Sequence, residues 1–187
     1  LIPFDWDTFH QYNGTYLVGV TNGRTGQAEY LDGTKLDKAN TMVKATCAIP
    51  LVFPPIYLDG QEYFDGGICD PIPVRKALAD GNKKVLIVLT RPASYEKTLS
   101  KSNRAAARIL KNKYPKLVEP LLTRHIHYNE TVRFCEQLER QNKAVLLRPE
   151  GAGIIDSFEK DLGKIERCYQ YGYNLAQQRM DEIAALF

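Results

Sequence analysis

One carboxylate in this 187-residue sequence lies where it could do chemistry. Asp65 ends a short β-rich segment, residues 62–64, and is followed directly by Gly66 and Gly67. Because glycines have no side chains, a ligand or another backbone can come close to the carboxylate. Strand ends are also where open α/β sheets bind ligands. Taken alone, the three residues are more simply interpreted as a tight turn with no catalytic role.

The stretch around Asp65 carries a longer set of residue types at fixed spacings. Residues 45–73 read ATCAIPLVFPPIYLDGQEYFDGGICDPIP, and the informative positions are Ala45, Thr46-Cys47, Ala48-Ile49-Pro50, Phe53-Pro54-Pro55, Asp59-Gly60, Tyr63, Asp65-Gly66-Gly67, Ile72-Pro73 and Ala77. Together these residues resemble the patatin-like phospholipase family. The resemblance is strongest from residue 45 to about residue 95, and upstream it includes Ile2-Pro3-Phe4-Asp5.

The resemblance implies a lipid acyl hydrolase, of the phospholipase or esterase type, with a role in lipid metabolism and degradation. In this family a Ser-Asp dyad does the chemistry: the serine attacks the acyl ester, and water cleaves the resulting acyl-enzyme. Asp65 matches the carboxylate that accepts the serine proton, and Gly66 and Gly67 match the glycines that let the serine approach. A carboxylate with an ordinary pKa of roughly 4 is a weak base, so close contact and an oxyanion hole must compensate.

The sequence departs from the family pattern at the nucleophile. The family carries its serine in a G-x-S-x-G elbow and its oxyanion hole in a glycine-rich loop, both upstream of the matching residues. Neither motif occurs here, because the serines, Ser94, Ser100, Ser102 and Ser157, lie in other contexts. We therefore expect this chain to be the C-terminal part of a patatin-like domain, and to be inactive on its own.

Other chemistries have little support in the residue types. His125 and His127 lack a third zinc ligand in their motif, and the residues around them are typical of a helix. Gly151 and Gly153 are too few for a dinucleotide-binding motif, and no Walker A pattern occurs. The cysteines form no C-x-x-C pair, which favours reduced thiols in a cytoplasmic-type protein. We expect neither a metal nor a cofactor.

The composition excludes several broad classes of protein. Hydrophobic residues make up 44% and charged residues 25%, as in globular rather than disordered proteins. The formal net charge of +3 gives no reason to expect nucleic-acid binding. The longest uncharged run, residues 45–58, is interrupted by prolines and falls short of the roughly 20 apolar residues of a membrane-spanning helix. We expect a cytoplasmic protein, with peripheral membrane contact as a further candidate property.

Basic residues recur on one face of a predicted helix. Lys97, Lys101, Arg104, Arg108 and Lys111 follow one another at spacings of 4, 3, 4 and 3 residues, which places them on one side of a helix. The simplest interpretation is a solvated face, or ion pairs with acids such as Glu159 or Asp161. The alternative is that Lys101, Arg104, Arg108 and Lys111 contact anionic lipid headgroups, at about 1 kcal/mol per basic residue.

The elements that must position these residues follow from hydrophobic periodicity and turn signals. Strands are predicted at residues 15–21, 27–31, 62–64, 85–89 and 144–147, and helices at 36–47, 71–80, 99–112, 117–141 and 162–186. The apolar run at 85–89 is typical of a strand that is buried on both faces. This alternation predicts an α/β fold with helices layered around a mostly parallel sheet. We expect a single domain whose helical C-terminal extension begins at about residue 97.

The expected loss of N-terminal strands has a consequence for assembly. It would leave sheet edges exposed, and exposed edges pair with other chains, so a homo-oligomer is a candidate state.

Three functions are consistent with the sequence. The leading one is an acyl hydrolase in which Asp65 is the base and the serine lies outside this chain. The second is a non-catalytic interaction or regulatory module that keeps part of a patatin-like fold. The third is an unrelated α/β binding protein. A glycine-rich loop and a G-x-S-x-G elbow upstream would favour the enzyme, and their absence would favour the module.

Overall fold

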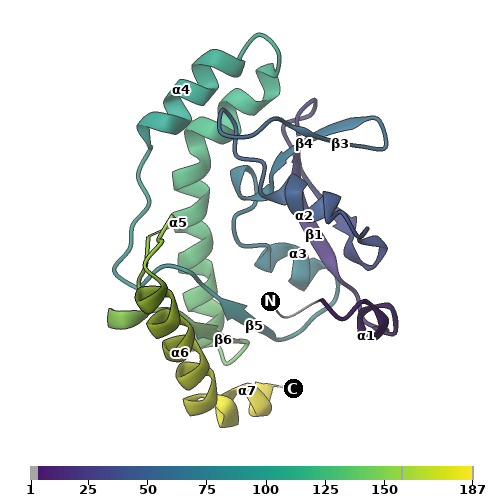
Figure 1. The fold of residues 1–187 in the computed structure, drawn as a ribbon. Coiled ribbons are helices and arrows are strands. Elements are labelled where there is room, and N and C mark those ends of the chain that lie inside the picture. Colours follow the sequence, from purple (N-terminus) through teal and green to yellow (C-terminus); the bar gives the residue numbers. More distant parts are fainter. Residues whose placement is uncertain (1–3, 157, 187) are drawn as a thin grey trace. The chain divides into compact units, whose positions relative to one another are not determined.

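A computed structural model describes residues 4–156 and 158–186 of the chain (Figure 1). The chain forms two compact units, each made of two separate stretches of sequence. The first unit comprises Leu1–Ile72 and Thr98–Tyr128, and the second comprises Pro73–Lys97 and Asn129–Phe187. The long helix α5 (Val118–Arg140) therefore begins in the first unit and ends in the second. The first unit contains Asp65.

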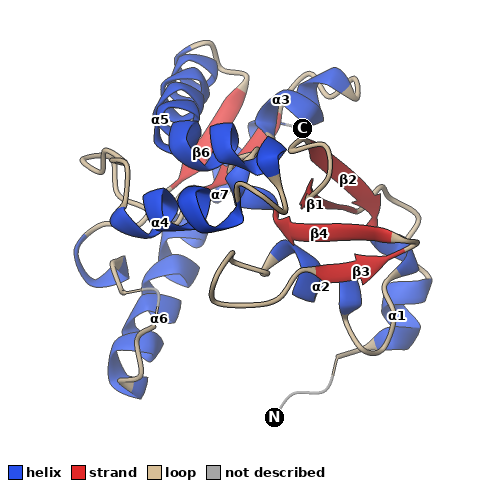
Figure 2. Cartoon of the chain, turned by 90° about the horizontal axis from the view of Figure 1, so that it is seen from above, coloured by secondary structure: helices blue, strands red, loops and turns tan. Residues whose placement is uncertain are grey.

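The first unit is built on a four-stranded antiparallel sheet. Its strands are β1 (Leu17–Asn22), β2 (Ala28–Asp32), β3 (Ile56–Leu58) and β4 (Gln61–Asp65). They lie in the order β2-β1-β4-β3, which Figure 2 shows from above. Two hairpins, β1–β2 and β3–β4, meet along the β1–β4 pair, so β4 is a central strand and its last residue is Asp65.

Local turn chemistry accounts for both hairpins. Asp59 and Gly60 join β3 to β4 with φ values of 48° and 75°, the positive values that a two-residue hairpin turn needs. After β1, the side-chain Oδ1 of Asn22 accepts hydrogen bonds from the backbone N–H groups of Arg24 (2.9 Å) and Thr25 (3.1 Å). Both turns thus contain residue pairs that favour turns in sequence, Asn22-Gly23 and Asp59-Gly60.

The mixed α/β class is confirmed, but the mostly parallel sheet is not. The larger sheet is antiparallel because short hairpins can join only antiparallel neighbours. Among the described residues, parallel pairing joins β5 (Val85–Val88) to β6 (Ala144–Leu147), in the second unit. The prediction that residues 85–89 are buried on both faces is wrong for β5, since Leu86 is 38% and Val88 is 70% exposed.

The helices of the first unit are α1 (Trp6–His10), α2 (Thr41–Thr46), α4 (Lys101–Leu110) and the start of α5. The helix predicted at residues 36–47 begins only at Thr41 in the structure, five residues later than predicted. Asn40 adopts a left-handed conformation with φ of 55°, which interrupts helical geometry. The carboxylate of Asp37 instead accepts hydrogen bonds from the backbone N–H (2.8 Å) and the hydroxyl (2.6 Å) of Thr41, and α2 starts there.

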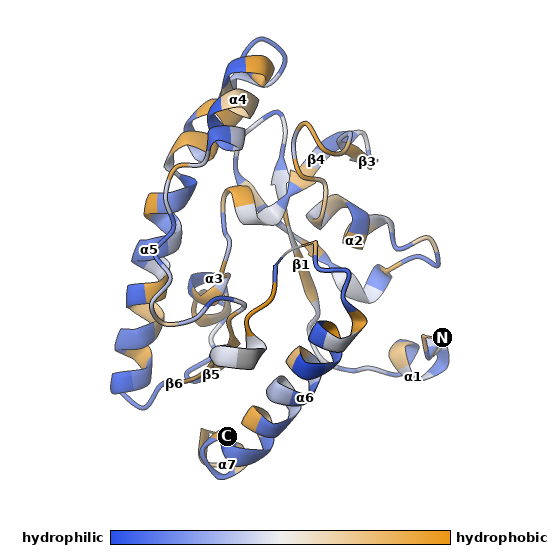
Figure 3. Cartoon of the chain, turned by 60° about the vertical axis from the view of Figure 1, so that its left-hand side comes forward, coloured by the Kyte–Doolittle hydropathy of each residue, from blue (hydrophilic) through white to orange (hydrophobic). Residues whose placement is uncertain are grey.

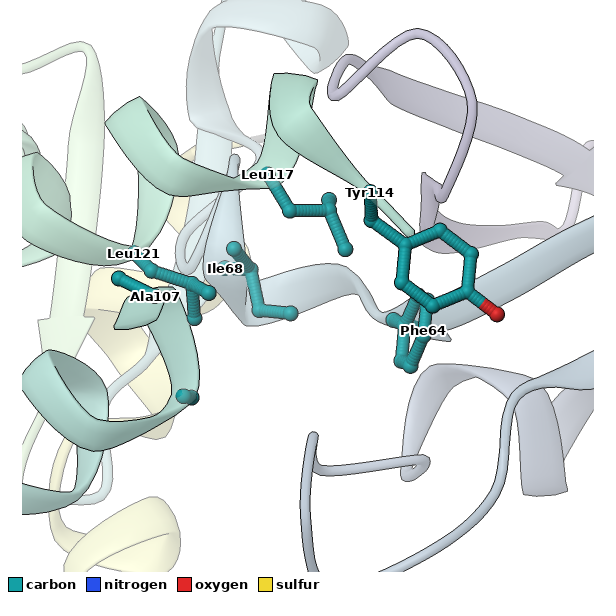
Figure 4. Packing of buried hydrophobic residues seen from close by; sticks show 7 residues of the cluster. Phe64, Ile68, Ala107, Tyr114, Leu117 and Leu121 are labelled. Carbon is teal, nitrogen blue, oxygen red and sulfur yellow. The ribbon is translucent and has the colours of Figure 1, made fainter. Parts of the chain in front are cut away.

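One buried cluster of the first unit packs helices α4 and α5 against the end of β4. Its buried residues are Phe64, Ile68, Ala106, Ala107, Tyr114, Leu117 and Leu121 (Figure 4). The rings of Phe64 and Tyr114 meet edge to face, with centroids 5.0 Å apart. Phe64 immediately precedes Asp65 and Ile68 follows Gly67, so this core fixes both sides of the Asp65 turn.

The second unit surrounds the β5–β6 pair with α3 (Val74–Ala79), the end of α5, α6 (Leu162–Gln178) and α7 (Met180–Leu186). The single helix predicted at 162–186 is wrong, because Arg179 separates α6 from α7. The guanidinium of Arg179 donates to the backbone carbonyl of Leu146 (2.6 Å) and to the carboxylates of Glu139 (3.2 Å) and Glu182 (2.7 Å). These contacts fix the junction between α6 and α7 against β6 and α5. The predicted positions of β6 and α5 are confirmed.

Candidate functional site

Asp65 is fixed through its backbone on both sides. It pairs with Val20 of β1, and its carbonyl oxygen accepts a hydrogen bond from the Thr21 hydroxyl at 2.9 Å. Its N–H donates to the carbonyl of Ala48, which follows α2, at 3.1 Å. The sheet and the end of α2 therefore determine the direction in which the carboxylate projects.

The side chain of Asp65 is oriented by the turn that follows it. Oδ1 accepts a hydrogen bond from the N–H of Gly67 at 2.7 Å, and this bond caps a short 3₁₀ turn, Gly66–Ile68. The residue is half-buried. Within the described part of the chain, no hydrogen bond reaches Oδ2. One carboxylate oxygen is thus held by the backbone, and the other has no hydrogen-bond donor among the described residues.

Gly66 and Gly67 each lie against a different neighbour that leaves no space for a side chain. A Cβ on Gly66 would lie 2.2 Å from the carbonyl oxygen of Gly19 in β1, so only glycine allows this strand to pass. A Cβ on Gly67 would contact Nη2 of Arg124 at 2.9 Å and Oδ1 of Asp65 at 3.0 Å. Gly66 therefore holds the turn against the sheet, and Gly67 leaves room for the guanidinium of Arg124.

Arg124 is a site residue that sequence reasoning missed. It lies on α5, and its Nε donates a hydrogen bond to the carbonyl of Gly67, 57 positions earlier in the chain. This cation is the charged group that α5 brings to the Asp65 turn. No local motif marks Arg124, because the contact depends on how α5 packs against β4.

An exposed apolar loop follows Ala48, the residue whose carbonyl accepts the Asp65 N–H. We call residues 49–53 the apolar loop; its exposed side chains are Ile49, Leu51, Val52 and Phe53. Leu51 has a φ of 69°, a left-handed conformation that is unusual for a bulky residue and strained. The loop starts directly after Ala48, whose carbonyl binds the N–H of Asp65. The apolar loop therefore exposes its side chains to solvent, directly after the residue whose carbonyl binds the Asp65 backbone.

Of the five basic residues predicted to share one helix face, Lys97 lies before α4 begins, and the other four lie on α4 or at its end. Lys101, Arg104 and Arg108 are exposed on α4 and Lys111 follows at its end, while Ala106 and Ala107 are buried in the core. The ribbon of α4 carries both hydrophilic and hydrophobic stretches (Figure 3). Within the described residues, none of the four cations forms an ion pair. The acids considered as partners are engaged elsewhere: Glu159 binds Lys164 at 3.1 Å, and Asp161 caps α6.

Other candidate groups of the first unit are poorly suited to nucleophilic or acid–base roles. Burial and the hydrogen bond from its hydroxyl to Glu29 together raise the pKa of Tyr63 to about 12, so the phenol stays neutral. Burial likewise raises the pKa of the Cys69 thiol, which disfavours the reactive thiolate. Ser100 accepts a hydrogen bond from the N–H of Asn103 (3.0 Å) and so caps α4. Ser157, like Ile2 and Pro3 of the motif, lies outside the described residues.

Metal-binding clusters and membrane-spanning helices are both absent from the described residues. No group of three or more His, Cys, Asp or Glu side chains in residues 4–156 and 158–186 could hold a metal ion. His125 and His127 lie on α5, in the helix that their surroundings predicted. No described helix is long and apolar enough to cross a membrane.

Comparison with known families supports the resemblance seen in the sequence. The model described as patatin-like phospholipase matches residues 12–78, which contain the whole four-stranded sheet and the Asp65 turn. A second model, described as a domain of unknown function (DUF6363), matches residues 114–187. A search of curated proteins found no match to the chain. The match to the patatin-like phospholipase family thus covers residues 12–78, a part of the chain that includes Asp65.

Proposed function

We propose that this protein hydrolyses acyl esters of lipids through a Ser-Asp dyad, with Asp65 as the base and a serine from outside these 187 residues as the nucleophile. The observation that supports this most is the asymmetry of the Asp65 carboxylate. Oδ1 is held by the Gly67 N–H at 2.7 Å, while Oδ2 has no hydrogen-bond partner among the described residues. A base of this kind is preorganised on one oxygen and accepts a proton on the other.

The proposed reaction has two halves. The serine hydroxyl gives its proton to Oδ2 of Asp65 while its oxygen attacks the ester carbonyl carbon, and the C–O bond to the leaving alcohol then breaks as the alcohol takes the proton back. Water repeats the sequence on the acyl-enzyme: Asp65 removes a proton from the water, and the serine leaves with that proton as the fatty acid forms. Asp65 ends each cycle as the carboxylate.

The surroundings of Asp65 suit a lipid substrate. The apolar loop offers exposed aliphatic and aromatic side chains in the segment that begins at Ala48, beside the Asp65 backbone. Four cations at α4, Lys101, Arg104, Arg108 and Lys111, form no ion pair with any described residue and give the same unit a basic surface. We propose that this basic surface contacts anionic lipid headgroups at the membrane, as a peripheral interaction.

The function is tested by replacing Asp65 with a residue of the same shape that cannot act as a base. In the full-length protein, Asp65→Asn keeps the acceptor for the Gly67 N–H and removes the charge. We expect kcat for a soluble p-nitrophenyl ester to fall by about 10²- to 10⁴-fold, the usual contribution of general-base catalysis.

A matched control lies in the preceding hairpin. Asp59→Asn makes the same chemical change at an exposed turn where asparagine is well tolerated at positive φ, so its kcat should stay close to that of the unmodified protein. Full turnover by the Asp65→Asn protein would exclude the dyad. A full-length protein without any esterase activity would favour the non-catalytic module.

A further inference from the structure

The second unit contains a pocket that the proposed reaction does not use. It has a volume of about 530 Å³, within the range of roughly 300–1,000 Å³ that is usual for small-molecule sites. All its lining residues belong to the second unit. They include Leu89, Leu147, Ile155 and Leu175, which give the pocket a largely apolar wall.

The pocket lies at the carboxyl ends of the two parallel strands. Val88 ends β5 and Leu147 ends β6, and both line the pocket together with the residues that follow them. β5 and β6 pair in register, from Val85 with Ala144 to Val88 with Leu147, so their carboxyl ends share one edge. In α/β proteins, ligands bind outside this edge.

Gly172 indicates that the space is kept open. It lies inside helix α6, where glycine destabilises the helix by about 0.5–1 kcal/mol relative to alanine. Its φ is not in the left-handed range, and a Cβ built on it would meet nothing within 4 Å. Neither backbone geometry nor a close neighbour among the described residues requires glycine here. Because Gly172 lines the pocket, a larger side chain would instead occupy the pocket.

Two arginines give the pocket a cationic character at the strand ends. Arg148 directly follows β6, and its Nη1 binds the carboxylate of Glu136 at 3.1 Å, which uses one of its five N–H donors. Arg91 follows β5, and its guanidinium carbon lies 5.1 Å from the ring centre of Tyr95. Guanidinium groups recognise carboxylates by paired hydrogen bonds. One acid, Asp156, also lines the pocket and is exposed to solvent.

We propose that this pocket binds a free fatty acid, with its carboxylate at Arg91 and Arg148 and its alkyl chain against the wall that includes Ile155 and Leu175. The combination of an apolar wall, arginines at one strand edge and a helix glycine that leaves the space open matches one acidic group joined to an apolar chain. If the proposed function holds, the ligand is also a product of the reaction, because acyl-ester hydrolysis releases fatty acids; this part of the inference rests on the proposed function. The binding itself does not depend on it.

Titration calorimetry of the 187-residue chain with decanoate, decanol and acetate tests this proposal. We expect decanoate to bind with a stoichiometry of one, at least tenfold more tightly than decanol, and acetate to give no measurable binding. Gly172→Leu fills the pocket and should weaken decanoate binding at least tenfold, while Gly172→Ala should change it little. Arg91→Gln should weaken decanoate binding without weakening the binding of decanol.

The control is Gln170→Leu, which adds the same side chain to an exposed position of α6 that does not line the pocket and should leave binding unchanged. Equal affinity for decanoate and decanol, or decanoate binding that Gly172→Leu does not weaken, would overturn the proposal. If decanoate does not bind but the full-length protein hydrolyses esters in an Asp65-dependent way, only this inference fails. If decanoate binds and Asp65→Asn keeps full turnover, only the proposed function fails.

Discussion

At the scale of single residues, the Asp65 turn is packed so closely that its glycines have no space for a side chain. Gly66 is tightly constrained, because a Cβ there would lie 2.2 Å from a backbone oxygen that cannot rotate away. We predict that Gly66→Ala destabilises the protein by about 1–3 kcal/mol, the usual cost of overpacking a close contact. Urea denaturation of the 187-residue chain measures this change.

The same substitution at Gly172 is the control. A Cβ there meets nothing within 4 Å, and alanine is the better helix former, so Gly172→Ala should stabilise the chain by about 0.5–1 kcal/mol. Opposite signs for the two glycines are the expected result. A Gly66→Ala protein as stable as the unmodified chain would mean that β1 does not pass as closely as the structure has it.

Arg124 gives a second prediction at this scale. Its Nε donates to the Gly67 carbonyl, so it positions the turn that orients Asp65 without taking part in proton transfer. We predict that Arg124→Met in the full-length protein lowers kcat by about tenfold, far less than Asp65→Asn, and leaves the shape of the pH–rate profile unchanged. Arg104→Met, at an exposed position on α4, is the matched control. A loss as large as that of Asp65→Asn would give Arg124 a direct catalytic role.

At the scale of elements, α4 carries a basic face that forms no ion pair within the described chain. Its cations Lys101, Arg104, Arg108 and Lys111 form no ion pairs there, while its alanines pack into the core. We predict that the full-length protein sediments with anionic liposomes more than with zwitterionic ones, and that salt weakens this binding, because exposed charges are screened within about 10 Å at 0.1 M.

Replacing these four residues with glutamate should abolish the binding and leave hydrolysis of a soluble ester unchanged. Since these side chains have no structural partner among the described residues, the thermal stability of the chain should also change little. Equal binding to both kinds of liposome, unaffected by the charge reversal, would leave a solvated helix face as the explanation. A large loss of stability would instead indicate that the cations have structural partners.

The elements also show where sequence reasoning succeeds and where it fails. The hairpin turns at Asn22 and Asp59-Gly60 were predictable, because their side chains and φ values are local properties. The start of α2 was missed because the cap made by Asp37 and the left-handed Asn40 interrupt a regular apolar spacing. The break at Arg179 depends on contacts with β6 and α5, which no local pattern encodes.

At the scale of the whole molecule, the order of the strands was the main thing that the sequence left open. Short apolar runs predicted strands, but not that two hairpins would join through β1 and β4 in an antiparallel sheet. Asp65 could be chosen from its glycines and its family resemblance. Arg124 and the pocket beside Gly172 could not, because both depend on helices packing against strands that are distant in the sequence.

The exposed face of β5 leads to a prediction about assembly. Leu86 and Val88 are exposed to solvent, and among the described strands β5 pairs with β6 alone. Exposed apolar strands promote pairing between chains, so we predict that the 187-residue chain self-associates in a concentration-dependent manner. Light scattering over a range of concentrations measures this. A monodisperse monomer at all concentrations would contradict the prediction.

The central claim, that Asp65 activates a serine outside these residues, is tested most directly by covalent labelling. A fluorophosphonate reacts with an activated serine, and intact-mass spectrometry of the full-length protein follows the rate, while peptide mapping locates the adduct. The account predicts a single adduct on a serine outside the 187 residues, formed at least about 100-fold more slowly in the Asp65→Asn protein. An adduct within this chain, or equal labelling rates in the two proteins, would contradict it.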